Sequence, residues 1–533
     1  MAQNPKGTGR FSRRNFLRHG ASLGAFAGLG GLPFASGANA QTSANGRILT
    51  ARIYADISNL DPAFWTSAVD ATVIRCIFAP SLAYETGTNK FTTHSIAMKS
   101  YQIVDDTHIS FELAPGIKYS GDYGEMTAED AKYSFERIAN PELNSPYMED
   151  WATLDHVEVT GQYTGIIALK QPFAPLLTTT LPGVSGVILP RAAIEAAGGK
   201  FAVQPPCFSG PYRIREWQPK TRLILERNPD WTLTDIAFDE LHLVPIEDPK
   251  TGDLGFEAGD LDFTEVSVSS IPRYAANAPA NSTFQRYDGL SYYWMGINQL
   301  NGQLVDQNVR RAIQHAVDRK TVVDAAYLGG ATPAAGIIAP ALIGSRAENI
   351  YNRDVDKARA LLEEAGVAGS LSLTISIQQT AENLAAAQVI QANLAEVGID
   401  AQINQYESGT FWSLGSKDEG EKYKDLQLFL MQFSMQPDPS WATMWFTSQQ
   451  IGVWNWQGFE NTEFDTLQAA AQIEVDSAKR DEMYKKMQDL MEESGDFVFL
   501  NFTPVGALSK VDIAAAIRPD GQPVLPEFLP AAG

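Results

Sequence analysis

The chain has 533 residues, a formal net charge of −22 and only two cysteines. Because nucleic acids and anionic lipid surfaces attract basic proteins, this acidic balance argues against both as partners. A chain of this length is long enough to form two or three domains with large hydrophobic cores.

The first 40 residues are predicted to be an export signal. The paired bases Arg13 and Arg14 stand in the segment SRRNFL (12–17), and a glycine-rich, weakly apolar run then leads to the small residues before position 41. This pattern is typical of a signal peptide that the twin-arginine export machinery recognises and that is later removed.

A transmembrane anchor is the alternative interpretation of this segment. Residues 21–36 are too short and too rich in glycine and alanine for that role. We expect cleavage after Ala40, which removes five bases and no acids, so that the formal charge changes from −22 to −27. The working protein is then an acidic, soluble protein of the periplasm.

The part of the chain between residues 100 and 250 mixes strand-like segments with turns rich in glycine, proline and asparagine. Two such segments are TRLILERN (221–228) and FDELHLVPIED (238–248), and the capping sequence TAED (127–130) predicts one helix. We therefore expect an N-terminal lobe of mixed β and α structure. The two cysteines, Cys76 and Cys207, are interpreted as separate buried thiols, with a disulfide as the open alternative.

Helices are predicted to follow this lobe. Asp306, Asp318 and Asp354 each precede apolar residues at helical spacing, as N-cap residues do. A later helix over 477–494 has methionines and leucine along one face, which we interpret as packing and not as a cofactor site.

The clearest local architecture is a βαβ unit over residues 371–406. Leucine and isoleucine alternate with polar residues from Leu371 to Ile377, which is the two-residue period of a strand. Thr380 can cap the helix that follows, Gly398 can end it, and alternation then resumes. Such a unit has parallel strands, so the C-terminal lobe is predicted to be of the α/β class.

Several motifs occur in a fixed order along the chain. They are Leu60-Asp61-Pro62, FELAPGIKYSGDYGEMTAEDAKYSFERI (111–138), SGPYRIREWQPKTRLILERNPDW (209–231), GINQLNGQLVDQNVRRAIQHAVDRKTVVDAAYLGGATPA (296–334), KARALLEEAG, IQANLAEVGID, PDPSWATMW and ENTEFDTLQAAAQ. In this order they resemble the extracellular solute-binding proteins of peptide and nickel ABC transporters, family 5, the large dipeptide- and oligopeptide-binding class. The resemblance extends from about residue 48 to about residue 512.

The resemblance implies an α/β, two-lobed periplasmic-binding-protein fold of type II-like topology, with mixed sheets flanked by helices. Lobe I is expected at 41–295 plus 500–533, with an inserted subdomain at about 87–195, and lobe II at 296–499. Such a protein closes its lobes on a ligand and delivers it to an inner-membrane ABC transporter permease. We expect a monomer that binds a peptide or peptide-like small molecule. An opine, an amino-acid conjugate, an oligosaccharide or a metal chelate is the alternative ligand.

The resemblance also implies a binding cleft between the lobes, formed by four segments. They supply Phe64, Trp65 and Thr66; Tyr292, Tyr293 and Trp294; Gln432, Ser434, Met435, Asp438 and Trp441; and Trp454, Asn455 and Trp456. Tryptophan and tyrosine suit such a cleft because each combines a flat apolar ring with one polar atom. We expect Trp454 and Trp456 in the cleft, and Trp441 and Trp445 in the core.

Asp438 allows two interpretations. Before Pro439 it is well placed to cap a helix, and it could instead hold a cationic ligand group. In peptide-binding members the aspartate that pairs with the ligand amine stands four residues before the matching proline, where this chain has Met435. A thioether there favours a neutral or apolar ligand portion.

Metal binding and catalysis receive no support from the motifs of the chain. The histidines of the mature chain are widely separated, and His315 is interpreted as a packed side chain. We expect no cofactor, no protein-held metal and no enzyme, since the sequence has no HExxH, GxSxG or phosphate-binding loop motif. A secreted hydrolase on the same scaffold is the remaining alternative.

Overall fold

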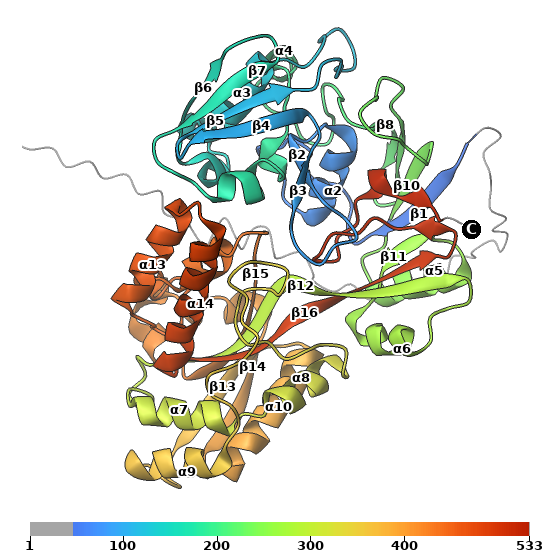
Figure 1. The fold of residues 1–533 in the computed structure, drawn as a ribbon. Helices are drawn as coiled ribbons and strands as arrows, with labels where there is room; N and C mark the ends of the chain where they lie inside the picture. The colour runs from blue at the N-terminus through green and yellow to red at the C-terminus, as the bar shows by residue number, and fades with distance from the viewer. Residues whose placement is uncertain (1–45, 532–533) are drawn as a thin grey trace, which may run out of the picture.

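Two long antiparallel strands join the two halves of the molecule (Figure 1). They are β12 (Ser282–Ile297) and β16 (Phe497–Lys510). The structure is a computed structural model that describes residues 46–531. The predicted lobe boundaries, at residues 295/296 and 499/500, both fall inside these strands.

β12 and β16 belong to a mixed sheet that continues into both lobes. Among residues 46–531 this sheet has ten strands in the order β14-β13-β15-β12-β16-β11-β1-β10-β9-β8. The remaining strands are β1 (Ile48–Ile53), β8 (Tyr212–Gln218), β9 (Arg222–Arg227), β10 (Glu240–Pro245), β11 (Phe263–Glu265), β13 (Ser372–Gln378), β14 (Asp400–Tyr406) and β15 (Leu428–Ser434). β13 pairs in parallel with both β14 and β15, and β1 pairs in parallel with β10, whereas the central β12 and β16 are antiparallel.

The chain from β4 to α4, called the inserted subdomain below, has its own antiparallel sheet, in the order β4-β5-β7-β6. Its main elements are β4 (Met98–Asp105), β5 (His108–Leu113), α3 (Ala128–Ala139), β6 (Leu154–Val159), β7 (Thr164–Leu169) and α4 (Arg191–Ala196). Thr127 and Asp130 form the capping box at the start of α3, as the sequence predicts. In Figure 1 this subdomain lies above the helices α13 and α14 of the other lobe.

The rest of lobe I surrounds the strands β8 to β11. It contains α2 (Ala68–Ile77), the short strands β2 (Leu82–Tyr84) and β3 (Thr93–Ser95), α5 (Pro249–Ala258) and α6 (Ile271–Ala276). The C-terminal elements β17 (Ile513–Ala514) and β18 (Leu529–Pro530) return to this lobe, where Ile513, Leu525 and Phe528 join its hydrophobic core.

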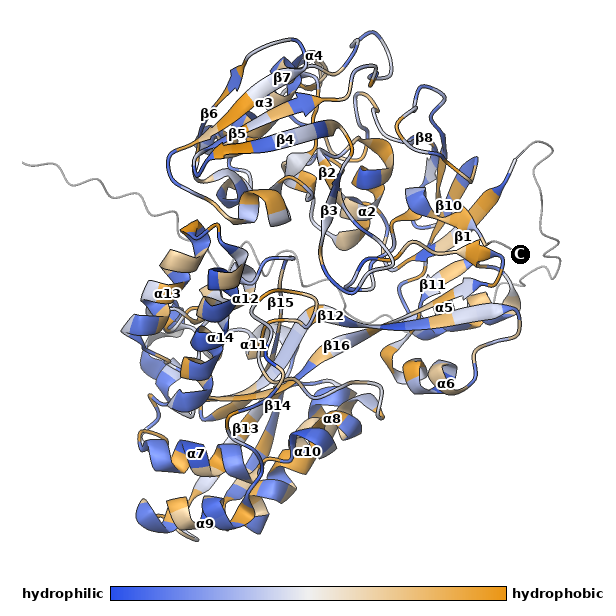
Figure 2. Cartoon of the chain, in the orientation of Figure 1, coloured by the Kyte–Doolittle hydropathy of each residue, from blue (hydrophilic) through white to orange (hydrophobic). Residues whose placement is uncertain are grey.

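Helices cover both faces of the lobe II sheet. They are α7 (Gln307–Ala316), α8 (Arg319–Tyr327), α9 (Val355–Glu364), α10 (Ala381–Glu396), α11 (Ser408–Phe411), α12 (Ser440–Thr443), α13 (Thr462–Ile473) and α14 (Ser477–Ser494). Figure 2 shows polar residues on the outward faces of α7, α9 and α14 and apolar residues on the strands behind them. This is the pattern of helices that pack one face on a sheet.

The local predictions for lobe II are confirmed. Asp306, Asp318 and Asp354 each accept a hydrogen bond from the first turn of the helix that follows. Thr380 caps α10, and Gly398 ends it with φ +83°, in the left-handed region that favours glycine. Met487 and Met491 are fully buried in α14, so the methionine face is packing.

Cys76 and Cys207 are both buried free thiols, so the separate-thiol interpretation holds and the disulfide alternative does not. Burial raises the pKa of each thiol to about 12, so neither ionises near neutral pH. Within residues 46–531, no helix is long and apolar enough to span a membrane.

Candidate functional site

A cleft of about 380 Å³ lies where the two lobes meet beside the crossing strands. Lobe I supplies the end of β1, the loop at Trp65 and one side of α2, and the C-terminal segment 518–525 closes the cleft. Lobe II supplies Ser434, the last residue of β15, and residues 435–437, which follow it. The two lobes therefore share one cleft, as expected for a protein that closes on a small molecule.

Three of the predicted binding residues line this cleft: Trp65, Ser434 and Met435. The Trp65 indole stacks on Tyr147, with 4.7 Å between ring centroids and 3° between ring planes. The Met435 side chain is buried, and its backbone N–H donates to the carbonyl of Leu290 at 3.0 Å. Stacking and main-chain pairing hold these walls in place before any ligand arrives.

Charged side chains line the same cleft, and the sequence analysis did not identify them. They are Arg52, Arg75, Glu265, Arg518 and Asp520. Arg518 donates to Asp520 at 3.0 Å and lies 4.5 Å over the ring of Tyr84. Arg52 donates to the backbone carbonyls of Ile246 and Glu265. Burial raises the pKa of Glu265 to about 7, so this carboxyl is only partly ionised at neutral pH.

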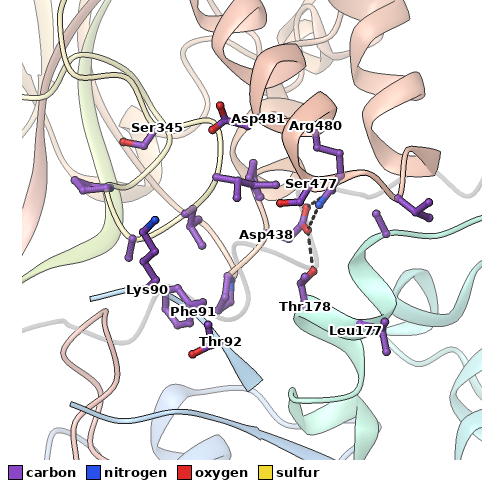
Figure 3. Close-up of a pocket in the computed structure, with 18 of the residues that line it drawn as sticks. Lys90, Phe91, Thr92, Leu177, Thr178, Ser345, Asp438, Ser477, Arg480 and Asp481 are labelled. Carbon is purple, nitrogen blue, oxygen red and sulfur yellow. Dashed lines mark hydrogen bonds and ion pairs between the residues drawn. The ribbon is translucent and has the colours of Figure 1, made fainter. Parts of the chain in front are cut away.

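A larger cavity of about 900 Å³ separates the inserted subdomain from lobe II. Figure 3 shows Lys90, Phe91 and Thr92 of lobe I on one side and Asp438 and Arg480 of lobe II on the other. Pro437 lines both cavities, which are therefore neighbours. Many of the residues around the larger cavity are apolar, among them Ile103, Ile109, Leu169, Phe173, Leu176, Leu177 and Phe502.

Asp438 lies in the larger cavity, where it is fully buried and bound to protein groups. Both of its oxygens accept from the Arg480 guanidinium at 3.1 Å, and one also accepts from the Ser440 backbone N–H at 3.0 Å. Burial acts against the charged carboxyl, but Arg480 and Ser440 outweigh it and lower the pKa of Asp438. The contact with Ser440 lies at the start of α12, where Pro439 and not Asp438 occupies the N-cap position. The cation that Asp438 holds belongs to the protein and not to a ligand.

Four other predicted residues line neither cavity. Thr66 donates to Asp70 at 3.0 Å and stabilises the loop before α2. Tyr293 donates to Asn383 at 2.7 Å, Trp294 is fully buried among aromatic rings, and the exposed Gln432 donates to Thr503 at 3.0 Å. Their side chains support the walls and strands next to the cleft.

The placement of Trp454, Asn455 and Trp456 differs from the sequence expectation. Trp454 is 4% exposed and Trp456 fully buried, and both lie in the aromatic core of lobe II together with Trp445. The Asn455 amide donates to the carbonyls of Phe446, Thr447 and Phe459, which fixes the turn between the two tryptophans. The polar residues around these tryptophans serve the backbone of a buried loop, and none of the three residues lines a cavity described above.

The other aromatic residues considered in the sequence analysis pack in the cores of the two lobes. Trp441 and Trp445 pack together in the lobe II core, with 6.3 Å between ring centroids, as expected. Tyr292 is buried and donates to the Ala442 carbonyl, and Phe64 packs against the core of lobe I.

One signal in the sequence could have identified Arg75: it is the single base in the apolar run VIRCIFAPSLAY.

Within residues 46–531, no group of three or more histidine, cysteine, aspartate or glutamate side chains could hold a metal ion. His315 contacts the Asn352 carbonyl at 2.8 Å and packs edge-on against Tyr351, so it is a packed side chain as predicted.

Two lobes, two crossing strands and a cleft between the lobes define the class of two-lobed ligand-binding proteins. The solved structure of HbpA2 from Haemophilus parasuis has this fold, with a TM-score of 0.79 and 21% sequence identity, and the match covers 91% of this chain and 100% of that one. The chain belongs to the bacterial extracellular solute-binding proteins, family 5, whose middle-region model matches residues 93–453.

Curated relatives cover most of the chain. A protein of Brucella ovis, provisionally named as an ABC transporter peptide-binding protein, is 27% identical over 402 residues, which are 73% of this chain and 74% of that protein. The glutathione-binding protein GsiB of Salmonella typhi is 24% identical over 413 residues, which are 74% of this chain and 78% of that protein.

Proposed function

We propose that this protein is the receptor of an ABC transporter, which captures a peptide or peptide-like small molecule between its lobes and delivers it to a permease in the inner membrane. The cleft of about 380 Å³ is the main support, because both lobes and the crossing strands contribute to its walls. A ligand that contacts both lobes favours the closed arrangement by its differential affinity. The relatives named for peptide and glutathione binding support this ligand class.

We further propose Trp65, Ser434 and Met435 as ligand contacts. The Trp65 ring and the Met435 thioether offer an apolar surface, and the hydroxyl of Ser434, which lies 2.7 Å from that of Ser291, offers a polar contact. The Met435 thioether at this position suits a neutral ligand portion better than a free amino group.

The export proposal rests on the sequence alone, because residues 1–45 lie outside the described part of the chain. SRRNFL and the run that ends at Ala40 support export through the twin-arginine machinery, cleavage after Ala40 and work in the periplasm. We propose that two lobes move relative to each other in the receptor. They are residues 41–295 plus 500–533, with an insertion at about 87–195, and residues 296–499.

Mass spectrometry of the protein purified from its native host tests this function. We expect a small molecule that co-purifies in stoichiometric amount, raises the melting temperature when added back and is recovered unchanged. A ligand that is recovered cleaved would instead support the secreted hydrolase. Protein that contains no small molecule and gains no thermal stability from any peptide library would contradict the receptor function.

A further inference from the structure

Arg75 occupies an unusual position on the wall of the cleft. It lies in the last turn of α2, between Ile74 and Cys76, both of which are fully buried in the lobe I core. Its side chain is one of the groups that line the 380 Å³ cleft. A basic residue on such a helix is expected either to pair with an acid or to have a function, since burying an unpaired charge costs free energy.

No hydrogen bond or ion pair involves the Arg75 guanidinium within residues 46–531, whereas the neighbouring cations are engaged. Arg518 is bound to Asp520, and Arg52 to two backbone carbonyls. The preceding 45 residues contain no aspartate or glutamate that could act as the partner. Burial and the positive charge of Arg518 lower the pKa of Arg75 to about 10, so it remains protonated at neutral pH.

The charged residues that line the cleft also favour an anionic ligand group. Among the described residues that line the cleft, three are bases (Arg52, Arg75 and Arg518) and two are acids (Glu265 and Asp520), and Asp520 is already bound to Arg518. Asp248 and Asp253, which do not line the cleft, act on Arg52 and not on Arg75. This part of the cleft is therefore positive in a protein that is strongly acidic as a whole. Such a local field attracts and holds an anionic group.

The wall supplied by lobe II has a different character. Ser434, Met435 and Pro437 bring no charge, and Pro437 leads to the larger cavity with its many apolar side chains. A ligand with one anionic end can place that end at Arg75 and extend its uncharged part along this wall.

We propose that Arg75 binds an oxyanion of the ligand, a carboxylate or a phosphate, while the neutral or apolar remainder of the ligand passes Met435 and Pro437 toward the larger cavity. The planar guanidinium suits either group, because both present two oxygens at a spacing that matches its N–H donors. This inference rests on the proposed receptor function and specifies the ligand that the receptor selects.

The test compares three libraries of tripeptides and tetrapeptides by thermal shift and calorimetry. One library has free C-terminal carboxylates, the second has C-terminal amides, and the third has C-terminal amides with one phosphoserine. We expect the free acids to raise the melting temperature and the plain amides to bind at least tenfold more weakly. Binding of the third library alone would assign the oxyanion as a phosphate.

Two variants, Arg75→Met and Arg75→Lys, test whether Arg75 is the residue that binds the oxyanion. Arg75→Met should lose at least tenfold in affinity for the free acids and bind the amides as the wild type does, and Arg75→Lys should retain part of the affinity. Without ligand, Arg75→Met should melt at the same temperature as the wild type or higher, because it removes a half-buried charge that has no ion-pair partner among the described residues. Arg213→Met, in a partly exposed ion pair with Glu226 outside the cleft, is the control for a lost charge.

Two outcomes would overturn the inference. Equal binding of free acids and amides with no gain from phosphoserine would exclude an oxyanion site and leave the receptor function intact. A large fall in the melting temperature of ligand-free Arg75→Met would show a structural role. If no library bound, the proposed peptide receptor would itself be wrong, and the inference with it.

Discussion

The hydroxyl of Thr178, on the inserted subdomain, donates a 2.9 Å hydrogen bond to Asp438 of lobe II (Figure 3). A second contact joins the same two parts, where the backbone N–H of Ala174 donates to the carbonyl of Gln472 at 3.0 Å. These bonds bridge elements on opposite sides of the larger cavity. They stabilise an arrangement in which the lobes touch, and their loss should favour an open one.

Thr178→Val should therefore shift the protein toward the open arrangement. The substitution keeps the side-chain shape and removes one hydrogen bond, which is worth about 0.5–1.5 kcal/mol. We expect a larger radius of gyration by small-angle scattering without ligand and a loss of affinity of about two- to tenfold. Thr160→Val, which removes a hydroxyl bonded to Thr164 within the subdomain, is the control. Identical scattering curves for wild type and Thr178→Val would contradict a closing role.

Asp438→Asn should destabilise the fold. The substitution leaves the buried Arg480 without a charged partner, which costs about 3–5 kcal/mol for a pair of this kind. Urea unfolding should show this loss, and the double substitution Asp438→Asn with Arg480→Met should recover part of it. If Asp438 were only a helix cap, asparagine would preserve both stability and affinity, and urea unfolding distinguishes the two cases.

Glu265 should make the protein less stable as the pH rises from 5 to 8. Burial disfavours the charged carboxyl and raises its pKa to about 7 in the folded protein, from an ordinary value of 4.5 that applies when the chain is unfolded. Below pH 4.5 both states are protonated; between 4.5 and 7 only the unfolded state ionises, so folding loses free energy as the pH rises. Arg52 lowers this pKa and Asp520 raises it, and both also line the cleft.

Glu265→Gln should remove this contribution, which we place at about 1–3 kcal/mol between pH 5 and pH 8 because water in the cleft screens part of it. Urea unfolding at the two pH values measures the difference, with the exposed Glu364→Gln as the control. A pH dependence that stays the same in Glu265→Gln would show that this carboxyl does not have a raised pKa.

The features that the sequence predicts well are those with a local cause. Asp306, Asp354 and Thr380 satisfy the free N–H groups of a first helical turn, and the alternation from Leu371 to Ile377 reports one buried face. These causes act within a few residues and need no tertiary information. The lobes and the insertion were expected from the resemblance of ordered motifs, because no local pattern marks the position of a hinge.

The site was harder to predict because its wall residues come together only in the folded chain. Trp454 and Trp456 stand among polar residues, but Asn455 bonds three backbone carbonyls and so allows the whole loop to be buried. Arg75 shows the opposite case, since its apolar neighbours indicate a buried helix while its own charge faces a cleft. Whether such a residue is buried or faces a cleft depends on contacts with residues that are distant in the sequence.

Trp65 and Trp454 should respond differently to truncation. Trp65 lines the cleft, so Trp65→Ala should weaken the binding of a peptide ligand by about 1–3 kcal/mol. Trp454 contacts the rings of Phe433 and Trp445, each at 5.8 Å, so Trp454→Ala should cost about 3–5 kcal/mol of folding free energy. Calorimetric titration and urea unfolding of both variants separate the two effects. A stable Trp454→Ala with weakened binding would place the cleft at Trp454 after all.

Export should depend on the arginine pair. The run after Arg14 is diluted with glycine and alanine, so the general secretory route, which prefers a more apolar core, should recognise it poorly. Replacing Arg13 and Arg14 with lysine keeps the charge and removes the twin-arginine pattern. We expect uncleaved precursor in the cytoplasm, detected by fractionation and mass spectrometry, while Arg10→Lys, outside the SRRNFL segment, should be exported normally. A normal periplasmic yield of the double variant, with an N-terminus at Gln41, would show that another export route accepts this signal.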